Sequence, residues 1–165
     1  MLRLIVGLIA VLAICPIATA QKDAMYESIN RREAATWELA IQIWELAEPG
    51  YQEVGSSRLL ADTLERAGFR VERGVAEIPT AFTATFGSGS PVIAILGEYD
   101  ALPGLSQEAV PERIPRSQSK YGHGCGHHMF GAASASAAIA IAEQIQSAHL
   151  KGTVRFYGCP AEEGG

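Results

Sequence analysis

The stretch MFGAASASAAIAIAEQIQSAHLKGTVRFYGCP, residues 129–160, joins a helical pattern directly to a strand pattern. Residues 129–150 are so rich in Ala and Ser that they predict a helix able to lie very close to a sheet. Residues 152–160 are rich in apolar, β-branched and aromatic residues, which predicts a buried strand. A helix followed by a buried strand indicates a domain in which helices cover a sheet.

Two further helices are predicted upstream of this stretch. Residues 22–48 combine mixed charges with apolar residues at helical spacing, and the helix ends before Pro49. Its two tryptophans, Trp37 and Trp44, are expected in the core. Residues 58–68, RLLADTLERAG, predict the second helix.

Two strands and a long loop are predicted between the helices. TAFTATFG at 80–87 and PVIAILGEYD at 91–100 are separated by a turn and are expected to pair, with the second, nearly all apolar strand in the centre of the sheet. Residues 103–124 contain three prolines and no periodicity, which predicts a long loop, and loops of that length are usually functional or disordered. Because helices alternate with apolar strands, the sequence predicts an α/β fold with a largely parallel sheet.

The amino terminus has the layout of a secretory signal peptide. Residues 1–20 hold an apolar run that ends in Ala-Thr-Ala at 18–20, similar to an A-x-A cleavage site. We therefore expect cleavage before Gln21 and export to the periplasm or the cell exterior. We expect no stable membrane anchor, because a spanning helix needs about 20 unbroken apolar residues.

Charge and cysteine content argue against two classes of protein. The formal net charge is −5, and it becomes −6 when residues 1–20 are removed with their single Arg and no acid. A mildly acidic exported domain is a poor candidate for nucleic-acid binding. Cys125 and Cys159 are the cysteines that remain, and they are too few for a disulfide scaffold, although one bridge between them stays open.

Polar side chains gather where three apolar segments end. Glu98 and Asp100 close one strand, Glu162 and Glu163 follow another, and GHGCGHH at 122–128 opens the long helix. Proteins of the α/β class place their sites at the carboxyl ends of strands and in the loops beyond them. We therefore expect these clusters to form one site.

The cluster before the long helix offers metal ligands. Side chains at i and i+2 of an extended segment share a face, so Cys125 and His127 are expected to converge, with His123 behind them. A thiolate and an imidazole suit zinc, manganese or another borderline cation. Asp100 is expected to accept the far N–H of His127 and to fix its tautomer.

The two adjacent glutamates are expected to divide their work. Glu162 and Glu163 are expected to face different atoms, so that one binds a metal and the other accepts a proton from metal-bound water. Two other hypotheses stay open. Cys125 could be a nucleophile activated by His123 or His127, which would leave the glutamates without a role. The chain could also be a metal-binding or peptide-binding module without catalysis.

Three motifs, AILGEYDALPGLSQ at 94–107, GHGCGHHMFGAA at 122–133 and GCPAEEGG at 158–165, together resemble a known family. It is the dinuclear-metal amidohydrolase and metallopeptidase family that includes carboxypeptidase G, aminoacylase and the indole-acetyl-amino-acid hydrolases. The resemblance runs from about Glu33 to Gly165. It implies a three-layer α/β/α catalytic domain with a largely parallel central sheet. It also implies cleavage of the amide bond of N-acyl or N-aminoacyl amino acids, such as para-aminobenzoyl-glutamate-like compounds or dipeptides.

The resemblance also implies a role for each site residue. Two divalent ions, zinc or manganese, would be bound, with Cys125 shared by both. His127 would bind one ion and Glu163 the other. Glu162 would be the general base, and Asp100 would be the family's orienting aspartate.

The chain departs from the family pattern in two respects. His128 stands where relatives usually carry Asp or Asn. The family also has two further histidine ligands downstream and a dimerisation or lid domain inserted after this point. We therefore expect residues 21–165 to be the amino-terminal part of such a catalytic domain and to be inactive alone. The full-length enzyme is expected to be a homo- or hetero-oligomer.

Overall fold

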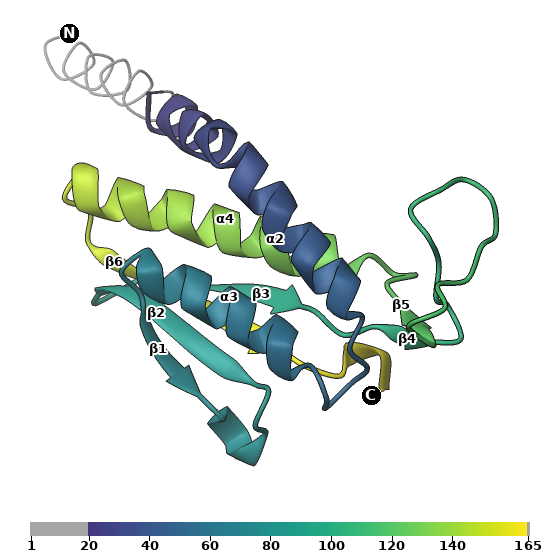
Figure 1. The fold of residues 1–165 in the computed structure, drawn as a ribbon. Coiled ribbons are helices and arrows are strands. Elements are labelled where there is room, and N and C mark those ends of the chain that lie inside the picture. Colours follow the sequence, from purple (N-terminus) through teal and green to yellow (C-terminus); the bar gives the residue numbers. More distant parts are fainter. Residues whose placement is uncertain (1–19, 165) are drawn as a thin grey trace, which may run out of the picture.

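The computed structural model describes residues 20–164, so that all of the expected signal peptide except Ala20 lies outside the described residues (Figure 1). Residues 20–31 are helical and are followed by α2 Glu33–Leu46, α3 Val54–Arg66, α4 His127–Ser147, and the short 3-10 helices η1 Val75–Glu77 and η2 Glu162–Gly164. The strands are β1 Arg70–Arg73, β2 Phe82–Ser88, β3 Val92–Glu98, β4 Leu102–Pro103, β5 Tyr121–Gly122 and β6 Gly152–Cys159. Each predicted helix and strand has a counterpart, except that the helix predicted over residues 22–48 is interrupted at Arg32. None of the helices in residues 20–164 has the length and apolar character needed to cross a membrane.

Four strands form one sheet in the order β1-β2-β6-β3. β2 pairs antiparallel with both β1 and β6, and β6 pairs in parallel with β3. The expected pairing of β2 with β3 is wrong, because β6 lies between them, and the sheet is mixed where a largely parallel one was expected. β3 lies at the edge of the described sheet, where Val92 and Leu96 are 53% and 52% exposed, so its expected central position is also wrong.

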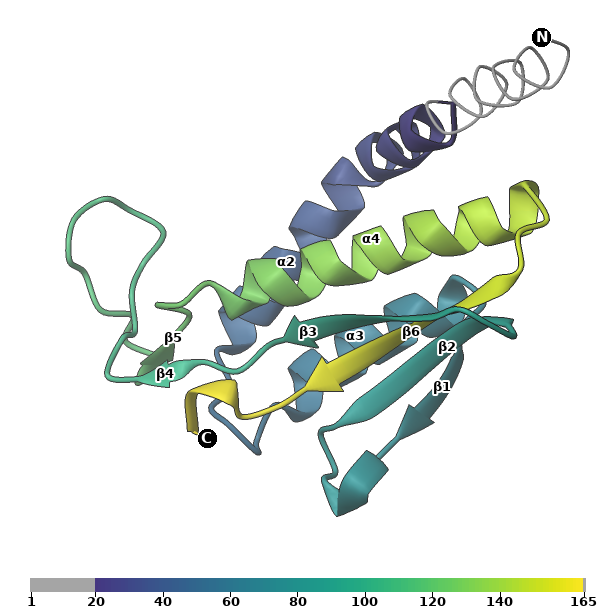
Figure 2. The ribbon, with the colours of Figure 1, turned by 180° about the vertical axis from the view of Figure 1, so that it is seen from behind.

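The helices α2, α3 and α4 lie on one face of the sheet (Figures 1 and 2). α3 and α4 pack on the strands, and α2 packs on both of these helices. Alternate strand residues point into this layer, since Phe82 and Ala84 of β2 and Val154 and Phe156 of β6 are fully buried. The α/β class is confirmed. The expected second layer of helices, on the other face, has no counterpart among residues 20–164.

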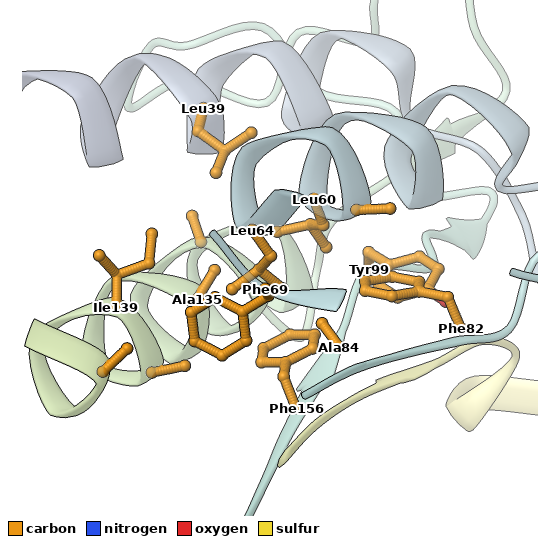
Figure 3. Close-up of a cluster of buried hydrophobic side chains, with 14 of the residues drawn as sticks. Leu39, Leu60, Leu64, Phe69, Phe82, Ala84, Tyr99, Ala135, Ile139 and Phe156 are labelled. Atoms are coloured by element: carbon orange, nitrogen blue, oxygen red, sulfur yellow. The ribbon is translucent and has the colours of Figure 1, made fainter. Parts of the chain in front are cut away.

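The core lies between the sheet and the helices (Figure 3). Phe156 stacks on Phe82 with 5.6 Å between ring centroids, and Leu60 of α3 belongs to the same cluster. α4 approaches β3 closely because it carries Gly131 there, where a Cβ atom would lie 2.5 Å from the carbonyl oxygen of Glu98. This contact sets the first turn of α4 beside the end of β3.

The two tryptophans of α2 do not lie in the core as expected. Trp37 is 61% exposed. Trp44 is half-buried, and the guanidinium of Arg116 lies 4.6 Å from its ring centroid. Arg116 belongs to the long loop between β4 and β5, which projects beyond the helices (Figure 1). A cation over an aromatic face is attractive, so this pair ties the loop to α2.

Candidate metal centre

His127, the first residue of α4, is held by Asp100. Its Nδ1 lies 2.8 Å from Asp100 Oδ1, and the two side chains are 6% and 0% exposed. A carboxylate oxygen can only accept a hydrogen bond, so the proton of the neutral imidazole lies on Nδ1. The lone pair on Nε2 is thereby free to bind a ligand, and the ring cannot turn away without losing the bond to Asp100.

Acidic side chains and a thiol gather around Nε2 of His127. Glu98 Oε2 lies 3.1 Å from this nitrogen, Glu162 Oε2 lies 3.7 Å from it and Glu163 Oε1 lies 3.8 Å from it. The candidate ligand atoms of Cys125, His127 and Glu163 all lie within 4.8 Å of one another, and so do those of Glu98, His127 and Glu162. The structure thus brings the predicted residues into one cluster, while their roles as ligands stay predictions.

Glu162 and Glu163 lie in η2, a 3-10 turn that follows the end of β6 at Cys159. The expectation that they face different atoms is wrong, since both approach Nε2 of His127. Adjacent side chains point to opposite faces in a strand, whereas a helical turn does not alternate them between two faces. Burial separates the two glutamates instead, because their side chains are 53% and 19% exposed respectively.

The cluster is rich in negative charge. Burial raises the pKa of the Glu98 carboxyl, an effect that His127 opposes and the neighbouring carboxylates reinforce. The hydrogen bond and charge of Glu163 raise the pKa of the Cys125 thiol.

No cationic side chain balances this charge among residues 20–164, where every Lys or Arg ion pair is made elsewhere. Within the same residues, Glu163 Oε1 is buried without a hydrogen-bond partner. A buried carboxylate oxygen without a partner is costly, and a bound cation would remove that cost. The thiol, imidazole and carboxylate donors therefore fit a divalent metal ion.

The remaining histidines and cysteine of the sequence motifs lie outside this cluster. His123 Nε2 donates to the carbonyl oxygen of Ile43 at 3.1 Å, and burial lowers the pKa of His123 to about 4. The ring of His128 packs against it with 4.9 Å between centroids. Cys125 and Cys159 are both free thiols, so the bridge left open by the sequence is not formed.

The geometry weighs against Cys125 as an activated nucleophile. The reactive form is the thiolate, whereas the carboxylates around Cys125 raise the pKa of its thiol. A cation at the cluster would reverse this effect by favouring the thiolate.

The sequence places Glu98 among the polar clusters expected to form one site but assigns it no role, and the structure brings it into the cluster. Glu98 and Asp100 are two residues apart at the end of β3 and approach His127 from its two nitrogens, Glu98 at Nε2 and Asp100 at Nδ1.

Several known proteins are similar to this chain in sequence. No model of a known protein family matches the chain. One of the subunits of the p-aminobenzoyl-glutamate hydrolase of Escherichia coli is 51% identical over 129 residues, which cover 78% of this chain and 27% of that protein. Thermostable carboxypeptidase 1 of Saccharolobus solfataricus is 30% identical over 138 residues, which cover 81% of this chain and 34% of that protein.

A solved structure shares the fold. A dinuclear metal-binding peptidase of the M20 family from Bacillus subtilis superposes with a TM-score of 0.69 at 29% identity, covering 81% of this chain and 37% of that one. The chain spans between 27% and 34% of the length of the two curated relatives named above.

Proposed function

We propose, on the premise that this chain resembles the dinuclear-metal amidohydrolases and metallopeptidases, that it carries part of the active site of such an amidohydrolase. The observation that carries the proposal is the convergence of Cys125, His127 and Glu163, whose candidate ligand atoms lie within 4.8 Å of one another. The buried bond from Asp100 supports it, because that bond keeps Nε2 of His127 aimed at the other donors.

Two divalent ions, zinc or manganese, fit the donor atoms. Cys125, His127 and Glu163 are the residues that would hold them. Thiolate and imidazole donors suit zinc, and carboxylates such as Glu98 and Glu163 suit manganese as well. When bound, the ions would polarise the amide carbonyl and lower the pKa of a water molecule.

Glu162 is the proposed general base. Its side chain is 53% exposed, against 19% for Glu163, so Glu162 faces the side that water and substrate can reach. It accepts a proton from the attacking water and then passes that proton to the leaving amine, which lets one carboxylate serve both halves of amide hydrolysis. Asp100 keeps the imidazole of His127 in one orientation throughout.

The proposed substrate is the amide of an N-acyl or N-aminoacyl amino acid. One relative is named a hydrolase of p-aminobenzoyl-glutamate and another a carboxypeptidase. The first of these is also named as one subunit of its enzyme, which supports our further proposal that the protein works as an oligomer of like or unlike chains. Export is a proposal that rests on the sequence of residues 1–20.

The test is hydrolysis of p-aminobenzoyl-glutamate and of dipeptides by the protein purified from its source, before and after treatment with a chelator. We expect activity to be lost with the metal and to return when zinc or manganese is added. Activity that survives chelation and is lost on alkylation of Cys125 would support a thiol hydrolase instead. Metal binding without hydrolysis of any such amide would support a non-catalytic binding module.

A further inference from the structure

Glu53, the N-cap residue of α3, is a buried carboxylate that lies outside the metal cluster. It is 0% exposed, and its side chain makes no capping bond to its own helix. Its Oε1 instead accepts the backbone N–H of Ala161 at 2.7 Å, across 108 residues of sequence. Burying a carboxylate is costly unless its oxygens are hydrogen-bonded, and the N–H of Ala161 supplies one such bond.

Ala161 has an unusual backbone conformation directly before the two site glutamates. Its φ is 57°, in the left-handed region that residues other than glycine adopt only when their surroundings hold them there. Ala161 immediately precedes Glu162, and its conformation sets the direction in which η2 leaves β6. The bond from Glu53 is therefore placed where it can control the aim of both carboxylates.

A second buried carboxylate holds the other side of the same turn. The backbone N–H of Glu163 donates to Asp100 Oδ2 at 2.9 Å. Glu53 and Asp100 thus hold the amides of residues 161 and 163, one on each side of Glu162. Asp100 also holds His127, and so the turn and the imidazole share one support.

Gly50 completes the support for Ala161. A Cβ atom at Gly50 would lie 3.0 Å from Ala161 Cβ and 3.1 Å from its Cα, so glycine is the residue that lets the two segments meet. Its neighbour Pro49 forms a bridge with Ala101, next to Asp100. The segment 49–53 therefore contacts the residues that follow β3 and the residues that follow β6.

From these contacts we propose that Glu53 is a positioning residue of the metal centre, which acts through the N–H of Ala161 to aim Glu162 and Glu163 at the metal. The inference rests on the proposed function. Substitution of Glu53 should weaken metal binding more than any loss of folding stability explains. Residues that orient metal ligands without binding the metal commonly change metal affinity.

The test measures cobalt(II) binding to the purified metal-free protein by the near-ultraviolet absorption of the cobalt–thiolate bond. Glu53→Leu removes the acceptor and should weaken cobalt(II) affinity by about 10- to 100-fold. Glu53→Gln keeps an oxygen that can accept from Ala161, so its affinity should stay near that of the wild type.

The matched control is Glu48→Leu. Glu48 is a carboxylate just before the segment 49–53, and it accepts the N–H groups of Gly55 and Ser56 at 2.9 and 2.8 Å in the first turn of α3. Its loss should lower the melting temperature and leave the cobalt(II) affinity unchanged. If Glu48→Leu and Glu53→Leu weaken cobalt(II) affinity equally, the effect comes from general stability and the inference is wrong.

Other outcomes also decide the matter. A folded Glu53→Leu protein with wild-type affinity, or a Glu53→Gln protein as weak as Glu53→Leu, would overturn the role of Glu53. If Glu53→Leu does not fold, Glu53→Met, which also lacks an acceptor oxygen, takes its place; weaker binding would support the inference and unchanged binding would refute it. Unchanged affinity in Glu163→Gln would refute the proposed metal centre itself and so separates the two failures.

Discussion

The backbone N–H of Glu163 donates to Asp100 Oδ2 at 2.9 Å. The other oxygen of the same carboxylate, Oδ1, lies 2.8 Å from Nδ1 of His127. One fully buried side chain therefore fixes two of the three proposed ligands, one at the start of α4 and one in η2. Any substitution of Asp100 should therefore disturb both His127 and Glu163.

Asp100→Asn should weaken metal binding without unfolding the protein. Asparagine offers one acceptor oxygen where Asp100 offers two, so either His127 or Glu163 loses its bond. We expect metal affinity to fall by about 10- to 100-fold, as measured by cobalt(II) titration. Asp62→Asn, at a half-exposed aspartate of α3 that pairs with Arg73, is the control and should bind metal normally. Equal affinities in both variants would contradict the support role of Asp100.

Glu162→Gln and Glu163→Gln should have different effects, although both carboxylates approach the same nitrogen of His127. In the enzyme purified from its source, Glu162→Gln removes the proposed base, so turnover of the proposed amide substrate should fall by about two to four orders of magnitude while metal content stays nearly intact. Glu163→Gln removes an anionic ligand, so metal content should fall first, with activity partly restored by excess metal. Metal analysis and kinetics on the same samples check this. Loss of metal in Glu162→Gln alone would reverse the two roles.

The thiol of Cys125 should titrate above its ordinary pKa in the metal-free protein. Glu163 raises the pKa of this thiol by favouring the protonated form, so the fraction of thiolate at a given pH is reduced. Replacing the carboxylate in Glu163→Gln should therefore shift the pH dependence of alkylation to lower pH. The measurement is the rate of the iodoacetamide reaction as a function of pH. It is made in a Cys159→Ser variant, so that Cys125 is the one free thiol left among residues 20–164. An unchanged profile would mean that Glu163 does not act on Cys125.

Gly131→Ala should destabilise the protein. A Cβ atom at this position would lie 2.5 Å from the carbonyl oxygen of Glu98, so α4 would have to move off β3. Overpacking of this kind costs about 1–3 kcal/mol, against a gain of about 1 kcal/mol from helix propensity. Urea denaturation measures the balance. Ala133→Gly, on the exposed side of α4, calibrates the propensity effect, and a net stabilisation by Gly131→Ala would contradict the close contact.

The sequence predicts the elements better than their arrangement. The apolar period identifies the strands that contain Phe82 and Phe156, because burial on one face leaves a pattern in each strand separately. It does not say that these two residues stack across a β2–β6 pair, since that pairing joins segments some 70 residues apart. The predicted central position of β3 is wrong for the same reason. An apolar run such as that around Ile95 indicates burial, but it does not indicate a place in the strand order.

The candidate site shows the same division. Cys125, His127 and Asp100 can be identified from residue chemistry at the ends of apolar segments, and the structure places them together. Glu53 could not be identified, because a glutamate at the start of a helix is ordinarily read as favourable for the helix dipole. Its contact with Ala161 depends on a left-handed residue and on tertiary packing, and neither leaves a local pattern.

The most direct test of the central claim, that Cys125 belongs to a metal centre, is X-ray absorption spectroscopy of the zinc-loaded protein. We expect a sulfur atom at about 2.3 Å from zinc together with nitrogen and oxygen atoms at about 2.0–2.2 Å. The sulfur should disappear in Cys125→Ser and remain in Cys159→Ser, whose thiol lies outside the cluster. A spectrum without sulfur in the wild type, or one that keeps its sulfur in Cys125→Ser, would contradict the claim.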